Sequence, residues 1–556
     1  MMTRKNIIRT GIFLLIIFSQ TSQKTLAQVD SIIFPDSVKC TWITNQAVPL
    51  FVIQFTRSFR ERLLADPYRP AYHFCVPEDR GYPGDPNGAF FYRGLYHLMY
   101  LYEREGRGFS WGHVSSNDML HWRHHPDALE PGNGDEGVYS GGGFVDDDGT
   151  AILSYWMLWG AKGIGLARSI DDNFDNFKKF GNNPVIKSTE WGITEMEDES
   201  GMSIHIGSAD PSNIWKKDGK YYMLTGNLLV LNKYGRKDES PADEQGDRLY
   251  LFSSDDLENW VYLHRFYESD RKWTDRSEDN MCPSFLPLPA SPDGGRPSGK
   301  HILVFISHNK GCQYYIGDYK NDRFYPDIHG RMTWIDQAYF APEALIDEKG
   351  RHILWTWIFD ERPDEVSKAS GWTGTYGLPR SLWLGDDGAL RMRPVKELEQ
   401  LRMNEKTVSN IIVRPGEDIN LDEDTYDLME LEVILATDKA EQYGLKVCMS
   451  EDGREETVIY YDKVDSKLKV DIRKSGLEYG PRVIEEAPFE LGDGEPLVLR
   501  VFIDKSVVEV YANDRQAIAR RIYPTLGGKG VSLFSRGGKV TAESIKIWEM
   551  MSANPY

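Results

Sequence analysis

The sequence is poor in cysteine. Its 556 residues contain five, at Cys40, Cys75, Cys282, Cys312 and Cys448. None forms a C-x-x-C pair, which argues against a zinc ribbon. An odd, sparse set also does not build a disulfide framework, and we expect at most two bridges.

Positive charge is in deficit as well. The chain has 65 Lys and Arg against 85 Asp and Glu, a net charge of −20. This balance argues against nucleic acid or an anionic membrane surface as the main partner. It suits a neutral substrate such as a carbohydrate.

Long apolar runs are missing. The one candidate, Gly11 to Phe18, is far shorter than the ~20 residues that span a bilayer. It follows Arg4 and Lys5 and precedes Thr25-Leu26-Ala27, which together predict a signal peptide over residues 1–27, the alternative being a short buried helix. No cysteine directly follows the apolar run, so a lipid anchor is not indicated. We therefore expect an exported protein, periplasmic or extracellular, with no membrane anchor.

Several catalytic signatures are absent. The sequence has no GxxxxGK[ST], no GxGxxG after a strand and no HExxH. His121 and His125 are four residues apart, but they flank Trp122 in a turn-rich segment, which favours packing over zinc binding. We expect no cofactor and no catalytic metal.

What the chain has is aromatic residues and repeats. Its 15 Trp, 29 Tyr and 24 Phe can bury a large core. Five segments share an extended start, a turn with glycine and a second alternating strand: Asp85 to Tyr100, Gly141 to Tyr155, Asp210 to Thr225, Cys282 to Ser307 and Ala341 to Trp357. Between them, Ser116 to Trp122 matches Ser254 to Trp260.

Each repeat amounts to about four strands. Four-stranded units arranged radially form a β-propeller, so we predict five blades, with a large irregular β-sandwich as the alternative. After Lys406, short strands and turn signals predict a β-sandwich, and Val395 to Leu401 predicts a linker helix. The predicted fold is all-β: a five-bladed propeller over residues 28–402 and a sandwich over 403–556.

Carboxylates recur near the starts of the repeats. They are Asp85, Asp210, Asp279 and Glu343. In a propeller the innermost strands line a central channel, so these groups are expected to converge there and to divide into acid and base roles. The alternative for each Asp-Pro is a turn residue that caps its own backbone.

The order of motifs resembles glycoside hydrolase family 32, the β-fructosidases. The matching segments are Tyr68 to Phe74, Gly84 to Gly88, Tyr96 to Leu98, Trp111 to Ser115, Tyr139 to Gly142, Asp210-Pro211, Cys282-Pro283, Tyr339 to Pro342 and Val501 to Tyr511. The resemblance implies a propeller with a C-terminal sandwich. It also implies that Asp85 is the nucleophile of a retaining hydrolase of fructans or other furanosides, and that Asp210 holds sugar hydroxyls. We expect carbohydrate contacts from Tyr82, Asn87, Trp111, Ser140 and Trp372.

The chain departs from this family pattern at two positions. Ala209 stands where the family has arginine, and Met281 stands where it has the acid/base glutamate. Methionine cannot transfer a proton. Asp279 and Glu343 are therefore candidates for the acid. Alternatively, the protein binds carbohydrate without turnover, or hydrolyses another furanoside such as an arabinoside.

Overall fold

The computed structural model describes residues 50–78, 81–104, 106–159, 163–197, 201–421, 427–437 and 439–554. The predicted signal peptide lies outside these ranges. The chain divides into two compact units, residues 1–58 and 59–556, and helix α1 (Leu50–Ala65) crosses their boundary. In the described part no helix is long and apolar enough to cross a membrane. Everything below concerns the second unit.

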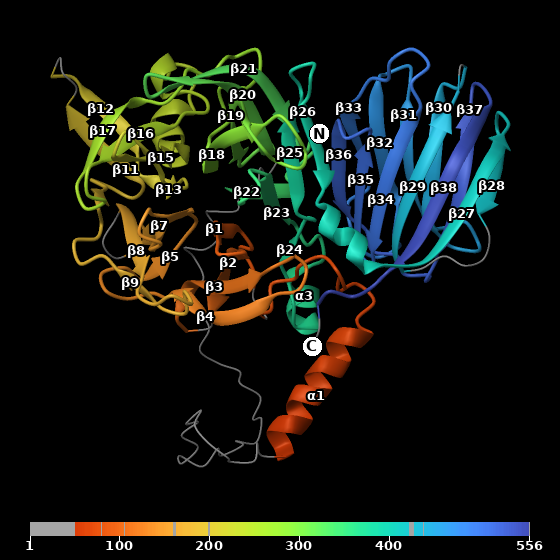
Figure 1. The fold of residues 1–556 in the computed structure, drawn as a ribbon, viewed down its shortest axis with the longest axis horizontal. Helices are drawn as coiled ribbons and strands as arrows, with labels where there is room; N and C mark the ends of the chain where they lie inside the picture. The colour runs from red at the N-terminus through yellow and green to blue at the C-terminus, as the bar shows by residue number, and fades with distance from the viewer. Residues whose placement is uncertain are drawn as a thin grey trace, which may run out of the picture. The chain divides into compact units, whose positions relative to one another are not determined.

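Five antiparallel sheets form the first part of this unit (Figure 1, orange to green). Blade one holds β1 (Pro86–Tyr92), β2 (Leu95–Arg104), β3 (Gly108–Ser116) and β4 (Arg123–Leu129). Blade two holds β5 (Gly137–Val138), β6 (Gly143–Val145), β7 (Ala151–Leu158), β8 (Gly163–Ser169), β9 (Phe177–Lys179) and β10 (Ile186–Lys187). A hairpin follows, formed by β11 (Ile193–Glu197) and β12 (Ser203–Gly207).

The other three blades continue in chain order. Blade three holds β13 (Ala209–Pro211), β14 (Trp215–Lys217), β15 (Lys220–Gly226), β16 (Tyr250–Ser254) and β17 (Trp260–Arg265), with α2 (Leu228–Val230), a π-turn (Leu231–Gly235) and a 3₁₀ turn (Ala242–Glu244) inserted after β15. Blade four holds β18 (Met281–Pro289), β19 (Pro297–Ser307), β20 (Gly311–Lys320) and β21 (Arg323–Arg331). Blade five holds β22 (Tyr339–Ile346), β23 (His352–Ile358), α3 (Asp364–Ser370), β24 (Thr375–Tyr376), β25 (Arg380–Leu384) and β26 (Leu390–Pro394).

The innermost strands close into a ring. Strand β1 contacts β6 and β22, β22 contacts β18, and β18 contacts β13, which contacts β7 of blade two. The predicted five-bladed propeller is therefore confirmed, because each repeat forms one sheet and the fifth sheet returns to the first.

The second set of repeats forms identical turns in blades one and three. Asp118 Oδ1 accepts hydrogen bonds from the backbone N–H of Leu120 and His121, and Asp256 Oδ1 accepts from Glu258 and Asn259, all at 2.8–2.9 Å. A short carboxylate that satisfies the backbone in this way stabilises a tight turn.

Three innermost strands carry a bulge beside their proline. The residue before that proline has a positive φ in each case: +37° at Asp210, +48° at Cys282 and +46° at Ala341. The strand pairing shifts register at the same places. Non-glycine residues in this backbone region are strained, and a bulge redirects the side chains beside it.

The C-terminal part is the predicted β-sandwich (Figure 1, cyan to blue). A 3₁₀ helix at Lys396–Leu401 links it to the propeller, where the sequence predicts a helix. One six-stranded sheet holds β27 (Arg402–Val413), β38 (Val540–Met550), β29 (Leu428–Ala436), β34 (Leu497–Asp504), β35 (Val507–Ala512) and β36 (Gln516–Arg521). The other holds β28 (Asp418–Leu421), β37 (Gly530–Arg536), β30 (Gln442–Met449), β31 (Glu456–Asp462), β32 (Lys467–Lys474) and β33 (Ile484–Pro488). Buried aliphatic side chains of both sheets form the core between them.

Buried polar groups join the sandwich to the propeller. Asp504 accepts hydrogen bonds from the backbone N–H of Ala71, Tyr72 and His73 at 2.6–2.8 Å, and it pairs with His73 Nδ1 at 2.9 Å. Glu509 of the sandwich forms an ion pair with Arg380 of blade five at 3.0 Å, with both side chains fully buried. The segment before blade one is thus held by the sandwich.

Candidate active site

Two buried aspartates lie where blades one and three begin. Asp85 comes directly before β1 and is 5% exposed, and Asp210 lies in β13 and is 3% exposed. The Cys282 thiol of blade four lies between them, with its Sγ 3.4 Å from Asp210 Oδ2 and 3.9 Å from Asp85 Oδ2. Residues that are far apart in the sequence therefore share one site, as the sequence predicts for Asp85 and Asp210.

The two carboxylates have different surroundings. Asp85 Oδ2 accepts a 2.5 Å hydrogen bond from the Ser140 hydroxyl, whereas Asp210 Oδ1 is buried without a hydrogen-bond partner among the described residues. Burial raises the pKa of Asp85 to about 6, although Ser140 and His308 oppose the rise. Burial and the neighbouring Asp85 raise the pKa of Asp210 to about 7. Asp85 is therefore the more acidic member of the pair.

A third carboxylate, Asp279, holds a histidine. Its Oδ1 accepts from the His308 backbone N–H at 3.0 Å, and its Oδ2 pairs with His308 Nδ1 at 2.7 Å. Asp279 is fully buried, while the His308 side chain is 33% exposed. The charge of His308 lowers the pKa of both Asp85 and Asp210, so the imidazole lies within electrostatic reach of the pair.

Comparison with known proteins identifies the family. Residues 73–394 match the model of the glycosyl hydrolases family 32 N-terminal domain, and residues 397–549 match that of the family's C-terminal domain. The chain belongs to glycosyl hydrolases family 32. It is thus a glycoside hydrolase with the architecture that the motifs indicate.

Curated relatives of the family 32 protein span most of its length. A sucrose-6-phosphate hydrolase of Zymomonas mobilis is 27% identical over 519 residues, 89% of this chain and 94% of that one. The levanase of Bacillus subtilis is 27% identical, over 86% of this chain and 70% of the levanase. The crystal structure of fructan 1-exohydrolase IIa from Cichorium intybus has the same fold, with a TM-score of 0.74, 22% identity and coverage of 88% of this chain and 98% of that one.

The two departures from the family pattern lie together in the family 32 protein. Met281 is 1% exposed and Ala209 is fully buried. Gly226 pairs with Ala209 across the strands of blade three, and its backbone leaves room for Met281 Sδ, which would lie 2.5 Å from a Cβ there. Met281 Sδ also accepts a hydrogen bond from the Leu228 backbone N–H at 3.5 Å.

Glu343 bonds to blade one, and neither Asp85 nor Asp210 affects the pKa of its carboxyl. It is 4% exposed, and its Oε1 accepts a 2.7 Å hydrogen bond from the Ala89 backbone N–H of blade one. Burial raises its pKa well above the ordinary value, and no charged neighbour contributes to the rise. The predicted face depended on regular alternation, which the bulge between Phe340 and Glu343 interrupts.

The expected carbohydrate contacts divide into three kinds. Ser140 binds Asp85, and Tyr82 is 61% exposed, with its ring 5.5 Å from that of Trp357. Asn87 is buried and joins the backbone of Asp85 to that of Gly141. Trp111 and Trp372 are buried, at 0% and 1% exposed, with their indole N–H bonded to Tyr139 O and to Asp66. These two tryptophans pack in the core, so their burial argues against stacking on a sugar.

Sequence reasoning overlooked three members of the site: Cys282, Tyr139 and His308. Asp85 and Asp210 both raise the pKa of the Tyr139 hydroxyl, after burial, so this tyrosine also faces the pair. The motifs Tyr139-Ser140 and Cys282-Pro283 contained a signal for the first two. His308 belongs to none of the motifs.

The sequence favours surface or packing roles for His121 and His125 over zinc binding. His121 lies on the surface with Asp118, whereas His125 lies near His97 and His113. These three imidazoles are close enough for a metal ion, with ligand atoms within 4.8 Å of one another. However, His125 bonds Ser115 and Asp175 through its two nitrogens, and His97 Nδ1 lies 2.9 Å from His113 Nε2. Four of the six ring nitrogens are thus hydrogen-bonded, whereas His97 Nε2 and His113 Nδ1 have no hydrogen-bond partner among the described residues.

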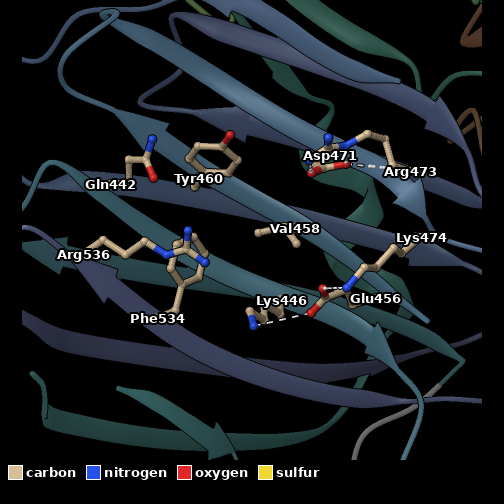
Figure 2. A pocket seen from close by; sticks show the side chains of 10 residues that line it. All are labelled: Gln442, Lys446, Glu456, Val458, Tyr460, Asp471, Arg473, Lys474, Phe534 and Arg536. Carbon is tan, nitrogen blue, oxygen red and sulfur yellow. Dashed lines mark hydrogen bonds and ion pairs between the residues drawn. The ribbon is translucent and has the colours of Figure 1, made fainter. Parts of the chain in front are cut away.

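The sandwich has a separate surface hollow of about 420 Å³ (Figure 2). The rings of Tyr460 and Phe534 lie among charged side chains there, and these charges pair with one another, as in Lys474 with Glu456 and Arg473 with Asp471. The hollow contains no residue of the aspartate site. The buried carboxylates of the propeller therefore remain the candidate for catalysis.

Proposed function

We propose that the protein hydrolyses β-fructofuranosyl linkages in fructan-type carbohydrates with retention of configuration. The observation that supports this most strongly is the pair of buried aspartates, Asp85 and Asp210, joined through the Cys282 thiol. Retaining glycosidases use one carboxylate as nucleophile. Asp85 suits that role because Ser140 stabilises its charged form.

In the first step Asp85 attacks the anomeric carbon and the bond to the leaving oxygen breaks. A proton passes to that oxygen, and a fructosyl ester of Asp85 forms. Water then attacks the anomeric carbon, loses a proton and releases free Asp85. Asp210, which is the less acidic of the two, donates or accepts a hydrogen bond at a sugar hydroxyl through its unpartnered Oδ1.

The substrate class rests on the relatives. Their names include levanase and fructan 1-exohydrolase, and one Cichorium structure of the latter is a complex with 1-kestose. Carbohydrate binding without turnover is the second candidate function, and the observation that favours it is the buried Met281 at the acid/base position. The experiment below also tests an arabinoside substrate, arabinan.

We also infer that the protein is exported. The charged residues, apolar run and Thr25-Leu26-Ala27 of its first 27 residues support this. The test is the N-terminal sequence of protein expressed in a bacterial host and recovered outside the cytoplasm. Removal of residues 1–27 supports export, and an intact N-terminus in the cytoplasm contradicts it.

The deciding experiment measures sugar release from sucrose, inulin, levan and arabinan by the wild type, Asp85→Asn and Asp172→Asn. Asp172 is exposed and lies in the turn between β8 and β9 of blade two, so its variant is the matched control. We expect release from a fructan or sucrose that falls at least 10³-fold in Asp85→Asn only. Saturable binding without release by any form supports the binding function instead, and release from arabinan alone changes the substrate class.

A further inference from the structure

The proposed reaction lacks a proton donor at the family's position. Met281 replaces the acid/base glutamate, and its thioether cannot supply a proton. Glu343 is turned to blade one, and both oxygens of Asp279 are taken by His308. A donor has to come from another side chain near the aspartates.

His308 is such a side chain. It directly follows β19, whose Ile306 pairs with Met281 across the sheet of blade four. Its ring lies edge-on to Phe340 of blade five, with ring centroids 5.7 Å apart. This places the imidazole near Met281, where blades four and five meet.

Asp279 fixes the orientation of this imidazole. It binds the His308 backbone N–H and Nδ1, so both the main chain and the ring are held. Nε2, the other ring nitrogen, has no hydrogen-bond partner among the described residues, and the ring is one-third exposed. A buried carboxylate on one nitrogen and a free second nitrogen is the arrangement of a histidine that transfers protons.

We propose that His308 is the general acid and base of this site and that Asp279 is its positioning residue. The inference depends on the proposed function, because it assigns the proton that the reaction of Asp85 requires.

The proton transfers balance over the two steps. In the first, Nε2 of the imidazolium gives its proton to the leaving oxygen while Asp85 bonds the anomeric carbon, and His308 becomes neutral. In the second, neutral Nε2 takes a proton from the attacking water as the ester bond to Asp85 breaks. Enzyme and charge return to their starting state, and no further reactant is needed.

The charged groups around His308 favour its protonated form. Burial opposes protonation, but the carboxylates of Asp279, Asp210 and Asp85 outweigh it and raise the pKa of the imidazole. Blade five contributes the uncharged Phe340. These carboxylates thus favour the protonated imidazole, which a general acid requires.

The test compares His308→Gln with His121→Gln. His121 has the same pairing, Nδ1 to Asp118 Oδ2 at 2.8 Å, but lies on the surface. Two substrates are used: sucrose, whose leaving oxygen needs a proton, and a 4-nitrophenyl β-fructofuranoside, whose leaving group departs without one. We expect His308→Gln to lower kcat/KM on sucrose by about 10²–10⁴-fold and on the nitrophenyl substrate by less than about 10-fold. His121→Gln is expected to retain wild-type rates on both.

The pH dependence of the rate in Asp279→Asn gives a second test, because loss of a merely structural residue would leave that dependence unchanged. The rate should fall as pH rises through the pKa of His308, and removal of the Asp279 charge should shift this alkaline limb to lower pH. Melting temperatures verify that both variants fold. If His308→Gln does not fold, the pH profile of Asp279→Asn tests the inference instead.

Two results overturn the inference in different ways. Wild-type rates and an unshifted alkaline limb in both variants, with activity still lost in Asp85→Asn, reject His308 and leave the proposed function standing. No hydrolysis of sucrose, inulin, levan or the nitrophenyl fructoside by the wild type rejects the proposed function, and the role of His308 with it.

Discussion

The Ser140 hydroxyl donates a 2.5 Å hydrogen bond to Asp85 Oδ2, which joins blade two to the residue that opens blade one. This bond favours the charged form of a carboxylate whose pKa burial has raised to about 6. The donor that a neighbouring blade supplies therefore favours ionised Asp85 at neutral pH.

Ser140→Ala removes that donor. The pKa of Asp85 should rise, so the acidic limb of the kcat/KM profile moves to higher pH, and the rate at pH 6 falls by roughly 10- to 100-fold, as for loss of a hydrogen bond to a charged group. Ser203→Ala is the control, because Ser203 donates a 2.6 Å bond to Glu195 on an exposed hairpin. An unshifted acidic limb in Ser140→Ala contradicts the assignment.

Asp210→Asn should stabilise the fold at alkaline pH while it abolishes activity. The folded-state pKa of Asp210, about 7, lies above its ordinary value of 3.8. Stability from the neutral carboxyl is thus fully present below pH 3.8 and is lost as pH rises through 7. Asparagine avoids this loss, so we expect a free energy of unfolding higher by roughly 1–3 kcal/mol at pH 8 and unchanged at pH 3. Urea titrations at both pH values measure it, with Asp172→Asn as control, and equal stability at pH 8 would contradict the burial of a charge here.

Glu343 provides a contrast between catalysis and structure. Burial raises the pKa of its carboxyl well above the ordinary value, and the carboxyl accepts a hydrogen bond from the Ala89 N–H, which glutamine can also accept. Glu343→Gln should therefore keep kcat/KM within about threefold, whereas Glu343→Ala leaves the Ala89 N–H unsatisfied and costs about 1–3 kcal/mol of stability. A large loss of kcat in Glu343→Gln, with an unchanged melting temperature, would restore Glu343 as the acid.

The buried ion pair of Glu509 and Arg380, which joins the sandwich to the propeller, should stabilise the folded protein. Burial opposes ionisation of Glu509, but Arg380 and His73 outweigh it and lower the pKa to about 2. Its stabilisation is present above pH 4.5 and is lost as pH falls through 2. Glu509→Gln leaves Arg380 unpaired, and we expect a loss of about 3–5 kcal/mol at pH 7.

Calorimetry measures the effect of Glu509→Gln. The exposed pair Glu417–Arg414, 3.8 Å apart, supplies the control Glu417→Gln, for which we expect a change below about 0.5 kcal/mol. Equal losses in the two variants would mean that burial of the ion pair is not the cause.

Much of the fold and part of the site follow from the sequence, because repeats constrain both. A repeat with proline at a fixed place puts Asp85 and Asp210 at equivalent positions of their blades, and closure of the ring brings them together. Glu343 occupies a similar place in its repeat, yet a bulge turns it away. Bulges depend on local strain, which alternation of residue types does not reveal.

The remaining residues of the site depend on contacts between distant segments. Trp372 resembled a sugar-stacking residue, but nothing in the sequence shows that Asp66, which is 306 residues earlier, binds its indole N–H. His308 follows Asp279 by 29 residues and meets it only because β18 and β19 pair. Because His308 reaches the site from the end of a strand, no sequence motif around it indicates its place there.

The hydrogen bonds of Asp504 also set an order of events during synthesis. The backbone of Ala71, Tyr72 and His73 leaves the ribosome more than 400 residues before the carboxylate that satisfies it. Domains usually fold from the N-terminus as they emerge. Here the segment before the first blade needs Asp504 of β34 in the sandwich. In a nascent chain that stops short of residue 504, the backbone N–H groups of this segment therefore lack their carboxylate acceptor.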